Sequence, residues 1–283
     1  MPVAAPVAAP AVAPVAPVEV APFRLFSAHV VRTERLTPGM TRVTFGGDDL
    51  AGFVNGGRDQ RIKLLFPSEG QTEPILPDQD ANGGWYRAWQ RMPAAWRPVM
   101  RTYTVRAQRV VQGEVDVDLA LHAGAAEGPA SRWARAARPG DRVGIFGPAV
   151  PDAGGVEFQL PADAGWVLLA GDETALPAIG AILESLPSGF PAEVFLRAAD
   201  PADRQDLRTA AAARFHWLHG DTLLSRAVAA ASADFRSEAP YVWLAGEAAQ
   251  VRAIRRHLVN QRAFSRESVT FMGYWRQGRS EDA

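Results

Sequence analysis

The sequence predicts a small antiparallel β-barrel followed by a doubly wound α/β domain. Residues 23–150 carry short runs of β-branched and aromatic residues separated by Gly and Pro, as in a barrel or sandwich. After about residue 160, apolar runs alternate with amphipathic segments, which indicates parallel βαβ units. A length of 283 residues also fits two domains. We therefore expect a tail over residues 1–22, a barrel domain over 23–155 and an α/β domain over 160–283.

Short strands dominate the barrel region. One helix is expected to begin at Ser131, a good N-cap residue, and to end before the turn at Pro139-Gly140. The Trp- and Pro-rich stretch 68–98 is interpreted as a long loop or lid. The expected strands span Phe23–Thr33, Met40–Gly46, Asp59–Phe66, Arg101–Gln108, Val115–His122 and Arg142–Phe146.

Strands and helices alternate in the second region. Trp166–Ala170 is continuously apolar, which is typical of a parallel strand that is buried on both faces. The next helix carries Pro177 in its first turn, where proline is tolerated, and an apolar face formed by Leu176, Ile179, Ile182, Leu183 and Leu186. Further strands are expected at Ala192–Leu196, Phe215–Leu218, Tyr241–Ala245 and Ser268–Met272, and further helices at Leu207–Ala213, Leu223–Ala231 and Glu247–Leu258.

The composition excludes several classes of function. The formal net charge is −1, so no overall field favours nucleic acid or a membrane surface. The chain has no cysteine, which excludes thiolate catalysis, cysteine-ligated iron–sulfur clusters and CxxC zinc sites. There is no apolar run of about 18 residues, so no transmembrane helix is expected. His216 and His219 lack a nearby carboxylate, and we expect no metal site.

The N-terminal 22 residues are almost wholly Ala, Pro and Val. Repeated proline disfavours a helix, so we expect an extended, disordered tail. The tail lacks the basic and continuous apolar regions of a secretory signal, and we expect a cytoplasmic protein.

The segment Arg101–Arg106 (RTYTVR) combines strand-like alternation with polar chemistry. A strand places Arg101, Tyr103 and Val105 on one face, and Thr102, Thr104 and Arg106 on the other. This pattern suits a flavin, because a tyrosine ring can lie against the isoalloxazine and arginine can hold a diphosphate by two hydrogen bonds. The alternative is an exposed edge strand with scattered charges, and the motif alone does not decide between them.

A second segment, from His122 to Ser131, is also suited to an anion. Its glycines allow a ligand to approach the backbone, and Ser131 with the helix N-terminus supplies hydrogen-bond donors. Together with the Arg101–Arg106 strand it would match the two phosphates of FAD. The alternative is a capped helix after a glycine loop.

Two strand ends in the α/β region precede helix N-termini, at Gly171–Thr174 and at Gly246-Glu247. Such ends are where open parallel sheets bind nucleotides. However, the acids Asp172, Glu173 and Glu247 would also stabilise these turns without any ligand, and there is no GxGxxG motif.

Six short segments occur in a fixed order: DQRIKLLFP (59–67), MRTYTVR (100–106), the stretch 122–134, AGDETALPA (170–178), WLAGE (243–247) and GYWRQGRSED (273–282). In these segments the chain resembles the siderophore-interacting proteins, a branch of the ferredoxin–NADP reductase-like flavoproteins. The resemblance covers about residues 24–282. It implies FAD in the barrel, a reduced nicotinamide cofactor at the second domain, and reduction of ferric siderophores.

The resemblance also implies roles for individual residues. It places Arg101, Tyr103, Thr104, Val105 and Arg106 at the flavin, and His122, Gly128, Pro129, Ala130 and Ser131 near the diphosphate or the adenosine. The turn formed by Asp172, Glu173, Thr174 and Ala175 replaces the glycine-rich turn of the wider superfamily, and Gly246 and Glu247 lie near the nicotinamide. An anionic ferric complex would meet a basic pocket of Lys63, Arg276 and Arg279. Trp275 and the aromatic residues of 85–96 either form its wall or pack elsewhere.

Arg197 departs from the family pattern, which often has an acid after this strand. An arginine there favours a 2′-phosphate, and hence NADPH over NADH. A ferredoxin is an alternative electron donor. Because the flavin would do the chemistry, no catalytic side chain is expected. Two other functions stay open: a general NAD(P)H:flavin or quinone reductase, and a non-catalytic ferric-siderophore carrier.

Overall fold

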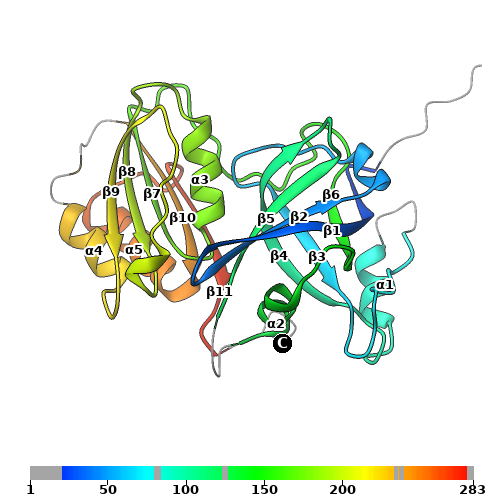
Figure 1. Ribbon diagram of the computed structural model, residues 1–283. Helices are drawn as coiled ribbons and strands as arrows, with labels where there is room; N and C mark the ends of the chain where they lie inside the picture. Colours follow the sequence, from blue (N-terminus) through cyan, green and yellow to red (C-terminus); the bar gives the residue numbers. More distant parts are fainter. Residues whose placement is uncertain (1–20, 80–83, 123–126, 233–234, 236–238, 279–283) are drawn as a thin grey trace, which may run out of the picture.

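The computed structural model describes residues 21–79, 84–122, 127–232, 235 and 239–278. It has a closed antiparallel barrel followed by a five-stranded parallel sheet, as the sequence predicts (Figure 1). The expected domain limits at 155 and 160 stay a prediction, and the expected tail lies almost wholly outside the described residues. Within the described part of the chain, no helix is both long and apolar enough to span a bilayer.

The barrel has the strand order β1-β2-β5-β4-β3-β6. The long strand β1 closes it by pairing with β2 along one part and with β6 along the other. Apolar side chains of every strand fill the interior, and Phe26, Phe45 and Leu64 are fully buried there. The strands are β1 (Phe23–Thr37), β2 (Met40–Gly46), β3 (Arg61–Phe66), β4 (Val99–Arg109), β5 (Glu114–Ala120) and β6 (Arg142–Pro148).

The stretch 68–98 is not simply a loop, which corrects the prediction. It contains α1 (Trp85–Arg91), whose Trp85 and Trp89 are four residues apart and share one face. Both are 8% exposed and pack on the outside of the barrel with Leu25, Leu65 and Met100. These two tryptophans therefore extend the apolar core on the outside of the barrel.

The parallel sheet has the order β11-β10-β7-β8-β9. Helix α3 covers the face toward the barrel, and α4 and α5 cover the opposite face (Figure 1). The strands are β7 (Trp166–Asp172), β8 (Pro191–Arg197), β9 (Ala212–Leu218), β10 (Pro240–Glu247) and β11 (Val269–Trp275), and the helices are α3 (Leu176–Ser185), α4 (Leu224–Ala231) and α5 (Ala248–Gln261).

The expected helix at Leu207–Ala213 is wrong. Residues 204–209 form no regular element, and β9 begins at Ala212 because Ala212 and Ala213 pair with β8. The Thr209 hydroxyl donates to the Leu183 carbonyl at 2.8 Å and accepts from the Ala211 amide at 3.1 Å. These bonds compete with a helical turn.

The sheet order places the topological switch point between β7 and β10. The chain leaves β7 through α3 toward β8, and leaves β10 through α5 toward β11. Ligands of doubly wound sheets bind beyond the strand ends at this point. The ends of β7 and β10 are Asp172 and Glu247, so these residues mark the crevice.

A buried carboxylate joins the barrel to the parallel sheet. Asp59, just before β3, is fully buried and accepts hydrogen bonds from the Glu157 and Phe158 amides and from the Trp243 indole, at 3.0–3.1 Å. Trp243 lies in the middle of β10. The contact fixes the sheet, the barrel and the segment that connects them at a single side chain.

Candidate functional site

The strand β4 presents its motif residues as the alternation predicts. Tyr103 and Val105 pack on the barrel core. Thr104 is 4% exposed and lies close to the Tyr274 hydroxyl of β11, which is buried and makes no hydrogen bond to the described residues. Burial raises the pKa of Tyr274, so its hydroxyl stays protonated and can donate. This buried donor without a partner among the described residues sits where β4 meets the parallel sheet.

The helix α2 (Pro129–Ala136) begins two residues earlier than predicted. Gly128 is its N-cap, and Ser131 lies inside the first turn, where its hydroxyl accepts from the His122 amide at 3.3 Å. The expected Ser131 cap is therefore wrong. Gly128 has no side chain to cap the helix, and a Cβ there would meet open space. Among the described residues no side chain caps the first N–H groups, which leaves them to an anion.

Helix α2 and the β4 motif are neighbours. Trp133 of α2 and Tyr103 of β4 both contact Phe66, with ring centroids 4.8 Å and 6.4 Å away. Arg101 is half-buried on the same strand, and one of its nitrogens donates to the Met100 carbonyl at 2.7 Å. An arginine, an aromatic ring and an uncapped helix N-terminus thus lie on adjoining elements of the barrel.

A chain of contacts joins this part of the barrel to the switch point. The His122 ring lies 6.2 Å from the Trp275 ring, and the Trp275 indole donates to Asp172 at 2.8 Å. Asp172 also accepts from the Glu247 amide at 2.7 Å and from the amide and hydroxyl of Thr174. The structure therefore brings His122 together with the β7 and β10 ends.

The anchoring role of Trp275 was not predicted. A lone tryptophan after the last strand carries no signal for a bond to a strand two places away in the sheet. The only available sign is the aromatic pair Tyr274-Trp275 directly after Gly273.

The acids at the switch point act on the backbone. The Glu247 carboxylate caps α5 by accepting from the Ala249 and Gln250 amides at 2.7 and 3.0 Å. Gly246 has φ +133°, and a Cβ there would lie 2.5 Å from Asp172 Oδ2, so glycine is required. Since carboxylates already use these N–H groups, a dinucleotide diphosphate does not fit directly at α5.

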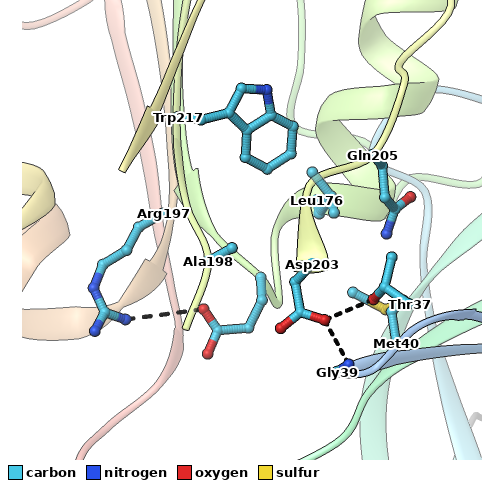
Figure 2. A pocket seen from close by; sticks show the side chains of 10 residues that line it. Thr37, Gly39, Met40, Leu176, Arg197, Ala198, Asp203, Gln205 and Trp217 are labelled. Carbon is cyan, nitrogen blue, oxygen red and sulfur yellow. Dashed lines mark hydrogen bonds and ion pairs between the residues drawn. The ribbon is translucent and has the colours of Figure 1, made fainter. Parts of the chain in front are cut away.

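Arg197 lies at the end of β8, where it is the register partner of Asp172. Its Nη1 lies 4.0 Å from Glu173 Oε2, and its Nη2 donates to the Gly220 carbonyl at 3.2 Å. Figure 2 shows Arg197 beside a small cavity that Glu173 also lines. The cavity drawn there holds about 10 Å³, room for one water molecule. On its barrel side, Asp203 accepts from the Thr37 hydroxyl at 2.8 Å and from the Gly39 amide at 2.5 Å.

A wider groove of about 380 Å³ adjoins this cavity and shares Gln205 and Trp217 with it. It includes Arg204, whose guanidinium lies 6.0 Å from the centre of the Trp217 ring. A second arginine, Arg204, therefore lines the groove next to the cavity that Arg197 lines.

Glu173 gives a testable pH dependence. Burial, and then the neighbouring Asp172 charge, raise the pKa of its carboxyl. The folded chain then binds this proton more tightly than the unfolded chain, so stability falls as pH rises through the folded pKa. Glu173→Gln is expected to raise the free energy of unfolding at pH 7 by about 0.5–1 kcal/mol. Urea unfolding should show this gain shrinking toward pH 4, and a constant gain at both pH values would contradict it.

The expected basic residues lie on different elements of the fold. Lys63 lies on β3 and donates to the Thr102 hydroxyl at 2.9 Å, while Arg276 directly follows β11 and is exposed. Arg279 lies outside the described residues. Arg106 points at helix α3, and Glu184 is its partner there. Among the described residues no cluster of three metal-ligating side chains occurs.

Both halves of the chain match family models. Residues 29–152 match the siderophore-interacting FAD-binding domain, and residues 164–278 match the siderophore-interacting protein model. The chain belongs to the siderophore-interacting protein family. Its barrel is therefore an FAD-binding domain, and the donor set agrees: Arg101, the Tyr103 ring and the uncapped α2 N-terminus suit a flavin with a diphosphate.

Individual members of the siderophore-interacting protein family are similar over most of their length. The ferric vibriobactin reductase ViuB of Vibrio cholerae is 33% identical over 89% of this chain and 90% of its own. The crystal structure of a siderophore utilization protein from T. fusca is similar, with a TM-score of 0.75 and 33% sequence identity. The match covers 93% of this chain and 96% of that protein's chain. The crystal structure of the siderophore-interacting protein SipS from Aeromonas hydrophila has a TM-score of 0.74 and 31% sequence identity. The match covers 92% of this chain and 94% of the SipS chain. The chain is thus a siderophore-related flavoprotein of the oxidoreductase type.

Proposed function

We propose that this chain is an FAD-dependent NAD(P)H oxidoreductase that reduces ferric siderophores and releases Fe(II) in the cytoplasm. The observation that carries the proposal is the contact chain from His122 through Trp275 to Asp172, which joins the FAD-binding barrel to the switch point of the parallel sheet. The similarity to a ferric vibriobactin reductase supports the choice of substrate.

The residues of the barrel would hold the cofactor. Arg101 and the first N–H groups of α2 would bind the diphosphate, and the Tyr103 ring would lie against the ring system. When bound, FAD would supply the redox chemistry that links a two-electron hydride donor to one-electron ferric acceptors. The side chains thus bind and orient, and no general acid or base is needed.

The charge of the substrate explains the basic residues. A ferric siderophore is commonly anionic, so Lys63 and Arg276, with Arg279, would attract it to the open side of the cofactor. Fe(II) carries less charge and is softer than Fe(III), so hard oxygen ligands hold it more weakly after reduction. Release of iron from the siderophore then follows from the reduction of Fe(III) to Fe(II).

We further propose NADPH as the preferred donor, because arginines at and after the end of β8, Arg197 and Arg204, would bind a 2′-phosphate. Arg197→Gln is expected to lower kcat/KM for NADPH about tenfold, since a charge-assisted phosphate contact is lost. The value for NADH should fall much less. Steady-state kinetics with both donors measure this, and equal losses would contradict a 2′-phosphate contact.

A ferredoxin is a second candidate donor. It is favoured by one observation: Asp172 and Glu247 use the N–H groups at the switch point that a dinucleotide diphosphate would need. Stopped-flow reduction of the loaded protein by NADPH, NADH and reduced ferredoxin compares the donors directly.

The function itself is tested by the choice of acceptor. Steady-state rates are compared for ferric catecholates, ferric hydroxamates, free flavin, ferricyanide and a quinone. The proposal requires the highest kcat/KM for a ferric chelate. A preference for free flavin or quinone would indicate a general reductase, and tight chelate binding without Fe(II) formation would indicate a carrier.

A further inference from the structure

Arg106 lies where the barrel meets α3. Its guanidinium forms a two-point ion pair with Glu184, near the end of α3, at 3.0 Å (Nη1–Oε2) and 2.6 Å (Nη2–Oε1). The Arg106 side chain is only 16% exposed. The resemblance assigns this arginine to the flavin, but the structure directs it at a carboxylate of the other half of the chain.

Residues of both the barrel and helix α3 surround the Arg106 guanidinium. On the barrel side, Asp118 of β5 lies 3.9 Å from the Arg106 Nε, and Arg42 holds Asp118 by two bonds of 2.6 and 2.8 Å. On the helix side, a Cβ at Gly180 would lie 3.5 Å from the Arg106 Nε, so the guanidinium lies against the α3 backbone. Gly180 and Glu184 are four residues apart and share one face of α3.

The backbone of β4 also turns at this residue. The pairing of β4 with β5 shifts register between Val105 and Ala107, so Arg106 occupies a bulge. Bulges bend a strand and redirect a side chain. Here the bulge follows Thr104 by two residues, about 7 Å along the strand.

We propose that Arg106 and Glu184 form a positioning pair that sets the FAD-binding strand against the dinucleotide end of the parallel sheet. Strand β4 carries Tyr103 and Thr104, and α3 begins directly after the Asp172–Ala175 turn. The pair therefore connects the two elements that must be aligned for hydride transfer, which requires reacting atoms about 3–3.5 Å apart.

The geometry of the Arg106–Glu184 pair suits a role in orienting strand β4 against helix α3 better than a role in stabilising the fold. A partly exposed ion pair adds little to the free energy of folding, whereas the planar guanidinium and a carboxylate define a direction when two parallel hydrogen bonds join them. The expected effect of the pair on hydride transfer rests on the proposed function, but its expected effect on the relative position of the two halves does not.

The absence of cysteine allows a direct test of position. Spin labels are attached at V111C, in the 94% exposed turn after β4, and at R252C, exposed on α5. Pulsed electron paramagnetic resonance then measures the distance distribution between the two halves without FAD. We expect E184Q and R106Q to broaden it, and the double variant to be no broader than either. The control E193Q, which breaks ion pairs within the α/β half only, should match the unsubstituted chain.

Two further measurements separate positioning from cofactor binding. FAD affinity of the apoprotein, followed by flavin fluorescence, should be unchanged in E184Q and in R106Q. NADPH reduction of the loaded protein should slow about tenfold or more in both, because small displacements strongly affect a hydride step. Melting temperatures of E184Q and E193Q should be similar.

Two results would overturn the proposal. One is an unchanged distance distribution in both E184Q and R106Q. The other is a loss of FAD affinity of about tenfold or more in R106Q with E184Q unaffected, which would make Arg106 a flavin ligand. If the unsubstituted chain accepts electrons from neither nicotinamide, the proposed donor fails, while the distance and affinity measurements still decide the role of the pair.

Discussion

Replacing Asp59 by alanine is expected to lower the free energy of unfolding by about 3–5 kcal/mol. The carboxylate is fully buried and accepts from the Glu157 amide, the Phe158 amide and the Trp243 indole. Alanine would leave three buried donors without a partner and a small void beside β10. Chemical denaturation followed by tryptophan fluorescence measures the effect.

The matched control for this change is Asp49→Ala. Asp49 also accepts two hydrogen bonds, from the Ser27 amide and the Arg24 guanidinium, but its side chain is 38% exposed. Water can replace those bonds, so we expect a loss of about 1 kcal/mol or less. Comparable losses for the two variants would show that Asp59 does not join the two halves as described. Asp59→Asn should fall between them, since one amide oxygen still accepts.

Arg101→Gln is expected to weaken FAD binding by about 10- to 100-fold. A hydrogen bond to a charged group contributes about 1.5–3 kcal/mol, and the glutamine amide cannot supply the paired donors of a guanidinium. Titration of the apoprotein with FAD, followed by flavin fluorescence, gives the dissociation constant directly.

Arg32→Gln is the control for charge alone. Arg32 is half exposed and pairs with Glu114 on the barrel surface. Its loss should leave FAD affinity within about twofold, because long-range charge effects are screened by salt. Equal affinity in Arg101→Gln and the unsubstituted chain would remove Arg101 from the cofactor site.

The periodic elements of the fold could be predicted from sequence. The alternation of residue types in Arg101–Gln108 predicts a strand with two different faces, and the continuous apolar run Trp166–Ala170 predicts a strand that is buried on both faces. Both segments are strands in the structure. The prediction of a helix at Leu207–Ala213 is wrong because parallel pairing with β8 outweighs the helix propensity of four consecutive alanines. Helix α1 was missed because its signal is only the pair Trp85 and Trp89 within a Pro-rich stretch.

The kind of ligand that the candidate site binds could be predicted from the sequence, but the contacts that join the two halves of the chain could not. Residue types in the Arg101–Arg106 strand and around Gly128 indicate anion and ring binding, which depends on local chemistry. The bond from Trp275 to Asp172 joins residues 103 positions apart, and that from Arg106 to Glu184 joins residues 78 apart. Such pairs depend on how the two halves pack, and no short motif encodes that.

The most direct test of the central claim is an anaerobic titration of the FAD-loaded protein. NADPH is added until the flavin absorbance near 450 nm is bleached, and a ferric catecholate or hydroxamate is then added with an Fe(II)-trapping dye. The account predicts that the absorbance returns while about two Fe(II) form per flavin, as a two-electron donor and a one-electron acceptor require. A bleached flavin that no ferric chelate reoxidises, or a purified chain that binds no FAD, would contradict it.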